Sequence, residues 1–197
     1  VTCSNISFIG KGADKTFLLG GFQVEGTNVL FQQFNISNTA VVDHPFNTGD
    51  GFVLNCVDCE IVDCIAQQCL GDGLFAQDGS TGTATRCEFM ENGLGGVQCW
   101  GAAKVRLNDC KMHHNEENGL YAEDQAVVDL HGTKTDIHSN KRCGIRASSH
   151  AEVNIHLSSQ HNTTHGNVGE DRGQSNGGSI ANINADGTFT HAVAEEE

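Results

Sequence analysis

Two stretches in the middle of the chain, Asn92-Gly-Leu-Gly-Gly-Val-Gln-Cys-Trp100 and Asn115-Glu-Glu-Asn-Gly-Leu-Tyr-Ala-Glu123, follow one pattern and begin 23 residues apart. In each, an Asn is followed four residues later by a Gly and then by an aliphatic residue. Further out, pairs of Gly and an apolar residue recur at steps of 22, 23, 23 and 25 residues, at Gly51-Phe52, Gly73-Leu74, Gly96-Val97, Gly119-Leu120 and Gly144-Ile145. The chain therefore contains a repeat of about 23 residues.

Two further markers share this period. One is Cys64, Cys87, Cys110 and Thr133, at steps of 23, and the other is Asn92, Asn115 and Asn140, at steps of 23 and 25. We place the two-residue insertion between Thr133 and Ile137. Because three separate markers share one period, the repeat is not a chance pattern.

Within each repeat the apolar residues alternate with polar ones, as in Leu120-Tyr-Ala122, Val105-Arg-Leu107 and Cys110-Lys-Met112. A period of two is typical of strands, and no sustained helical stripe occurs. The sequence thus predicts an all-β fold, a single-stranded right-handed parallel β-helix with about 23 residues and three short strands per coil.

In such a solenoid, equivalent inward residues of successive coils stack in columns. We expect three columns: Cys64, Cys87, Cys110, Thr133; Leu74, Val97, Leu120, Ile145; and Ala76, Cys99, Ala122, Ala147. The nine cysteines then act as small buried hydrophobes, in preference to disulfides or a metal site at Cys56 and Cys59. The Asn column is expected at a corner, in left-handed backbone, with each Asn bonded to its neighbour.

The repeat has recognisable ends. We assign residues 1–167 to the β-helix, with earlier coils around Ile6–Ile9 and Phe22–Val24 and a loop at 40–49. Residues 168–197 are expected to form a loop, a hairpin cap beginning at Ser179, and an acidic tail. The first coil near Val1 would leave an open edge, which allows self-association through coil ends.

Charge and cysteine usage limit the partners. The formal net charge of −14 argues against nucleic acid and anionic membranes, which bind basic surfaces. No targeting segment is expected at the N-terminus, and no window is apolar enough for a membrane helix. The compartment is unknown: free cysteines favour an intracellular location, whereas sequons at Asn5, Asn35 and Asn162 leave an extracellular one open.

The stretch from Asn92 to Asn162 resembles the right-handed β-helix repeats of the pectate-lyase-like superfamily, in particular the carbohydrate-binding and sugar-hydrolase repeats. The resemblance covers about residues 29–165 and implies the fold, whereas the superfamily hosts lyases, hydrolases, epimerases, adhesins and scaffolds. The family's catalytic motifs are not matched: Asn47-Thr-Gly-Asp50 only partly echoes a hydrolase motif. We therefore expect a non-catalytic domain that contacts protein or polysaccharide. The alternative is a carbohydrate-active enzyme or glycan-binding module.

Asp50 and Asp72 carry the enzyme alternative, because they occupy equivalent places in adjacent coils. Stacked carboxylates could divide acid and base roles or bind Ca²⁺. Asp-Gly is also an ordinary turn dipeptide, and we favour that interpretation. We expect no catalytic residue, no metal site and no cofactor. In the enzyme alternative, Asp50 and Asp72 are the catalytic residues and Ca²⁺ is the cofactor.

The outward side of the Gly-apolar strands is the expected binding surface. Aromatic rings interleaved with polar groups suit a sugar chain or an extended peptide, although such ladders also simply stabilise sheets. The ligand-binding candidates are Phe75, Gln98, Trp100, Tyr121, Glu123, Asp124 and Arg146.

Histidines cluster late in the chain, and His131 and His156 are expected to be outward neighbours on adjacent coils. Paired imidazoles can bind a transition metal or respond to mild acid. We see no carboxylate or thiolate ligand at matching positions, and therefore favour a surface role without metal.

Overall fold

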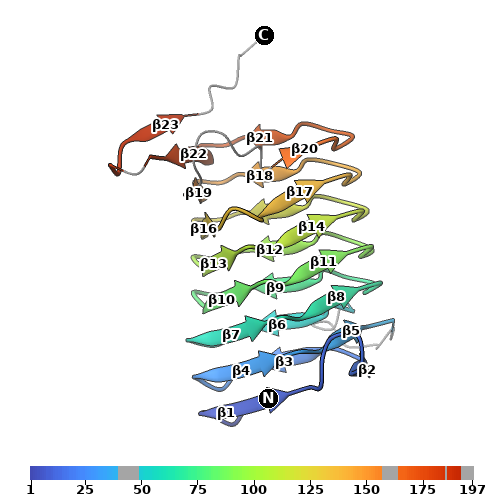
Figure 1. The fold of residues 1–197 in the computed structure, drawn as a ribbon. Helices are drawn as coiled ribbons and strands as arrows, with labels where there is room; N and C mark the ends of the chain where they lie inside the picture. The colour runs from blue at the N-terminus through green and yellow to red at the C-terminus, as the bar shows by residue number, and fades with distance from the viewer. Residues whose placement is uncertain (40–48, 157–163, 185, 192–197) are drawn as a thin grey trace.

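The computed structural model describes residues 1–39, 49–156, 164–184 and 186–191, and these form a single parallel β-solenoid (Figure 1). Each coil contributes one short strand to each of three sheets, which confirms the predicted fold of about 23 residues per turn. The described residues contain no helix long and apolar enough to cross a membrane.

Sheet A is the longest of the three sheets and has nine strands in the described residues. In order they are β1 (Ile6–Ile9), β4 (Val29–Gln32), β7 (Cys59–Val62), β10 (Thr81–Thr85), β13 (Lys104–Asn108), β16 (Val127–His131), β19 (Glu152–Ile155), β22 (Ser179–Ile183) and β23 (Phe189–His191).

Sheets B and C each have seven described strands, all parallel. Sheet B contains β2 (Phe17–Leu19), β5 (Asn35–Ser37), β8 (Ile65–Gln67), β11 (Glu88–Met90), β14 (Lys111–His113), β17 (Asp136–His138) and β20 (Thr164–His165). Sheet C contains β3 (Phe22–Val24), β6 (Phe52–Leu54), β9 (Leu74–Ala76), β12 (Val97–Cys99), β15 (Leu120–Ala122), β18 (Ile145–Ala147) and β21 (Arg172–Gln174).

The strand register confirms two of the expected columns. Val97 pairs with Leu74 and with Leu120, while Cys99 pairs with Ala76 and with Ala122. Ile145 and Ala147 continue the same two columns, and all eight side chains are buried. Small side chains in one column and larger aliphatic ones in the other together fill the narrow interior.

The cysteine column holds for Cys64, Cys87 and Cys110, but its next member is Thr135 and not Thr133, so that expectation is wrong. Lys111 pairs with Asp136, which places Thr135 over Cys110, and Thr133 is exposed. The insertion lies in the turn after β16 and not after Thr133. The buried Thr135 hydroxyl donates to the His131 carbonyl oxygen at 2.6 Å, which removes the cost of burying it.

The cysteines are free thiols, as expected: Cys3 is exposed and the other eight are buried. Several of the buried thiols donate to main-chain carbonyl oxygens of their own or the preceding coil. Burial raises the pKa of the Cys64 thiol, and it raises the pKa of Cys69 to about 11. These cysteines therefore serve the core as small apolar residues.

The Asn column forms a hydrogen-bonded ladder at the corner between sheets B and C. Asn115 Oδ1 accepts from both the main-chain N–H and the side-chain amide of Asn92, at 3.1 Å each. Asn140 Oδ1 accepts the same two hydrogen bonds from Asn115. Asn167 extends the ladder by one coil. The left-handed residues are those just before each Asn, such as His114 (φ 57°), so the expected left-handed backbone at the Asn residues is wrong.

The two ends of the solenoid differ in their packing. At the N-terminal end, rings of Phe8, Phe22, Phe31 and Phe52 fill the interior, with Phe22 and Phe31 centroids 4.5 Å apart. There β1, β2 and β3 form the edges of their sheets, as the sequence predicts.

At the C-terminal end, parallel stacking continues past residue 167, where the sequence predicts a loop: β21 pairs with β18 and β22 pairs with β19. The predicted hairpin is present, because β23 runs antiparallel to β22. The expected loop at 40–48 and the acidic tail lie outside the described residues.

Candidate functional site

The outer face of sheet C carries the row of side chains that the sequence predicts. Each of its strands has three residues, so the central one points outward while its two neighbours point into the core. Register places these central residues in one column: Phe75, Gln98, Tyr121 and Arg146. All four are half-buried, which leaves part of each side chain accessible.

Tyr121 is the fixed centre of this row. Its hydroxyl lies 3.0 Å from Ser148 Oγ, and the guanidinium carbon of Arg146 lies 5.9 Å from the centre of its ring. This separation allows a cation–π attraction, which holds Arg146 over the ring. Burial raises the pKa of the Tyr121 phenol, so the hydroxyl stays protonated at neutral pH and can donate. Ser148 is buried beside this hydroxyl.

A pocket of about 290 Å³ opens beside Tyr121. It combines residues from both candidate sets of the sequence, the outward row and the acidic pair. Its lining consists of Asp72, Leu94, Gly95, Gln98, Glu117, Asn118, Tyr121, Arg142 and Arg146. Side chains from consecutive coils thus converge on one concave surface that holds both cationic and acidic groups.

Asp50 and Asp72 are stacked as expected, and each accepts a main-chain hydrogen bond from the next coil. Asp50 Oδ1 accepts from the Asp72 N–H and Asp72 Oδ1 accepts from the Gly95 N–H, both at 2.6 Å. Burial, together with the nearby Asp50 carboxylate, raises the pKa of Asp72 to about 7. A Cβ added at Gly95 would lie 2.9 Å from Asp72 Oδ1, so a larger residue there would crowd the buried carboxyl group.

Asp50 of the acidic pair and four of the seven ligand-binding candidates lie outside the pocket lining. Phe75 is on the neighbouring strand of the row, and Trp100, Glu123 and Asp124 follow the ends of their strands. Trp100 is 39% exposed, whereas Glu123 and Asp124 are half-buried. Asp124 has a left-handed backbone (φ 54°), which is a turn role. The structure therefore brings together Asp72, Gln98, Tyr121 and Arg146.

Two charged pocket residues, Glu117 and Arg142, are not among the sequence candidates. Arg142 Nε lies 2.7 Å from Glu117 Oε2, and the Arg142 N–H donates to the Glu117 carbonyl oxygen, so the two stack directly. They precede strands β15 and β18 at the same repeat position as Leu94. The spacing of 23 and 25 residues from Leu94 to Glu117 to Arg142 is the signal that would have found them.

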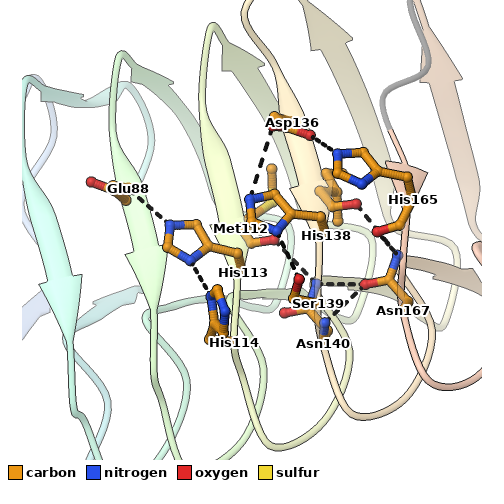
Figure 2. A network of polar contacts seen from close by, with 11 residues as sticks. Glu88, Met112, His113, His114, Asp136, His138, Ser139, Asn140, His165 and Asn167 are labelled. Carbon is orange, nitrogen blue, oxygen red and sulfur yellow. Dashed lines mark hydrogen bonds and ion pairs between the residues drawn. The ribbon is translucent and has the colours of Figure 1, made fainter.

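A second group of polar side chains lies on the outer face of sheet B (Figure 2). The rings of His113, His138 and His165 stack over one another, with centroids 4.9 and 5.1 Å apart. Carboxylates flank the column: His113 Nε2 lies 2.7 Å from Glu88 Oε1, and His165 Nε2 lies 3.0 Å from Asp136 Oδ1. We call His113, His138 and His165 the sheet B histidine column.

The three stacked sheets define a β-solenoid protein that has a pocket on the outer face of sheet C. The family model described as "Right handed beta helix region" matches residues 20–192, and the chain belongs to that family. No curated protein and no solved structure matches the chain significantly.

Proposed function

We propose that this β-helix is a non-catalytic interaction domain that binds an acidic carbohydrate across the outer face of sheet C. The observation that carries the proposal is the convergence of Gln98, Tyr121 and Arg146, from three successive coils, on one pocket. Shallow concave sites with an aromatic ring and a few placed polar groups suit sugar rings.

The charges in the pocket favour a carboxylate-bearing sugar. The chain has only 11 basic residues against 25 acidic ones, yet Arg142 and Arg146 both line this surface. A guanidinium binds a carboxylate through two parallel hydrogen bonds, and Arg146 is already oriented by the Tyr121 ring. Arg142 is held by Glu117, so Arg146 is the expected contact for the ligand's carboxylate.

Binding to an array of uronate-containing and neutral oligosaccharides tests the proposal. We expect Arg146→Ala and Tyr121→Ala to weaken binding of an acidic oligosaccharide by about 10-fold or more, the equivalent of one charge-assisted hydrogen bond. Arg86→Ala is the matched control, because it removes one exposed arginine that pairs with Asp63 away from the pocket. Equal binding by all three variants, or no binding to any acidic glycan, would contradict the proposal.

A second candidate function, polysaccharide cleavage, is favoured by one observation. Asp72 lines the pocket and its pKa of about 7 suits a general acid or base at neutral pH. A panel of acidic polysaccharides, with and without Ca²⁺, distinguishes the two candidates. Turnover that is lost in Asp72→Asn would support an enzyme, whereas binding without turnover supports the non-catalytic domain.

A further inference from the structure

A pair of imidazoles lies on the outer face of sheet A, away from the sheet C pocket. His131 is the last residue of β16, and His156 directly follows β19 on the next coil. Their rings stack nearly parallel, with centroids 4.2 Å apart and an interplanar angle of 9°. The expected pairing of these two histidines is therefore confirmed.

A carboxylate completes the group, so the expectation that none stands at a matching position is wrong. Asp129 lies two residues before His131, on the same outward side of β16, and its Oδ1 is 3.0 Å from His156 Nε2. One ligand atom from each of Asp129, His131 and His156 lies within 4.8 Å of the other two. Asn154 Nδ2 donates to Asp129 Oδ1 at 3.2 Å and so orients the carboxylate.

His131 contributes an unusual nitrogen to this group. Its Nε2 atom is shielded from solvent and has no hydrogen-bond partner within the described parts of the chain. Shielded polar atoms without a partner are rare in folded proteins, because each costs the full desolvation of the group. A bound metal ion would supply the partner that this nitrogen lacks.

We propose that Asp129, His131 and His156 form a binding site for a divalent transition-metal ion such as Zn²⁺. Two imidazoles and one carboxylate are a donor set that late first-row metals prefer, whereas Ca²⁺ and Mg²⁺ prefer oxygen ligands throughout. The 3.0 Å separation of Asp129 Oδ1 and His156 Nε2 is close to the ~3.3 Å between neighbouring ligands of a tetrahedral ion with bonds of about 2.0–2.1 Å.

The surroundings leave room for further ligands on the ion. Asp129 also lines an open groove of about 440 Å³ that extends along sheet A toward Asp58 and Thr81. Three protein ligands beside open space are typical of sites where water or an exogenous ligand completes the coordination.

Isothermal titration of the EDTA-treated, dialysed chain with Zn²⁺ tests this assignment, with the ligand-field absorption of Co²⁺ as a second readout. We expect binding tighter than about 0.1 mM in the native chain, and at least about 10-fold weaker binding in His156→Asn and Asp129→Asn. Both side chains are about one-third exposed, so these variants are expected to fold, which thermal unfolding without metal verifies.

The matched control is His165→Asn, which removes a histidine paired with a carboxylate in the sheet B histidine column. It should leave one Zn²⁺ bound with native affinity at the sheet A site. Native binding weaker than about 0.1 mM, native-like binding in both sheet A variants, or a loss confined to His165→Asn would each overturn the proposal.

Discussion

Asp72 shows how one residue can serve both the fold and the pocket. Its Oδ1 accepts the Gly95 N–H, and Asn118, at the equivalent position two coils later, accepts the Cys143 N–H at 3.1 Å with a neutral amide. A neutral acceptor is therefore sufficient for this hydrogen bond, and a charge is not required. The charge that Asp72 carries above its pKa of about 7 is a cost to the folded state.

This cost predicts a pH dependence of stability. The folded pKa of Asp72 lies above its ordinary value of 3.8, so its favourable contribution is complete below that value, is lost as the pH rises to about 7, and changes little above it. We therefore expect the melting temperature of Asp72→Asn to gain on that of the native chain as the pH rises from about 4 to about 7.5. Thermal unfolding followed by circular dichroism across this range measures it.

Asn118→Asp is the reciprocal control, because it places a carboxyl group at the equivalent buried position. It should steepen the loss of stability over the same rise in pH. Parallel curves for the native chain and Asp72→Asn would show that Asp72 is not the titrating group.

At the scale of an element, sheet B is a second source of pH dependence, with the opposite sign. His138 lies between His113 and His165 in the sheet B histidine column. Burial lowers its pKa, the neighbouring His113, His165 and His114 lower it further, and Asp136 opposes them. The neutral form of His138 is therefore the stable one.

Acidification should accordingly destabilise the protein through His138. A histidine whose folded pKa lies below the ordinary 6.5 contributes stability that is present above that pH and is lost as the pH falls through the folded pKa. We expect the melting temperature to drop between pH 6.5 and pH 5, and to drop less in His138→Gln. Equal drops would assign the effect to the other histidines or to carboxylates.

The strands of the central coils were predictable from the sequence because each of these coils places the same kind of side chain inward. Val97, Leu120 and Ile145 repeat that choice at a readable spacing. The position of the insertion was not readable, since Thr133 and Thr135 offer the same side chain on either side of one lysine. Only the turn geometry decides which of the two is buried.

The candidate site was predictable in its strand residues and in Asp72, which the repeated Asp-Gly turns mark. Gln98, Tyr121 and Arg146 follow from alternation within a strand, but Glu117 and Arg142 lie in turns, where alternation gives no direction. Likewise, the Asp129 side chain reaches diagonally to His156 on the next coil. Comparing only residues at the same repeat position does not find this contact, because Asp129 is in register with Asn154 and not with His156.

For the whole molecule, the cysteines provide probes of opening along the solenoid. Cys3 is exposed, and the other eight thiols are buried in successive coils. We expect one thiol to react promptly with a disulfide reagent at pH 8, and the others to react only as fast as their coils open, because thiol reactivity requires exposure and the thiolate form. Absorbance at the reagent's reporting wavelength counts the reacted groups.

Cys3→Ser is the control for that experiment and should remove the prompt reaction. Two or more prompt thiols in the native chain would mean that some coils are open at equilibrium. A uniform slow rate for the rest would instead show that the coils open as one cooperative unit.

The Asn ladder also gives the solenoid an electrical polarity. Each side-chain amide donates to the carbonyl of the next one along the axis, from Asn92 through Asn115 and Asn140 to Asn167, so their dipoles point the same way and add. The donor end of this series meets a negative charge, since Asn167 Nδ2 donates to Asp171 Oδ1 at 2.8 Å. A carboxylate thus terminates the positive pole, just as acidic residues do at the start of an α-helix.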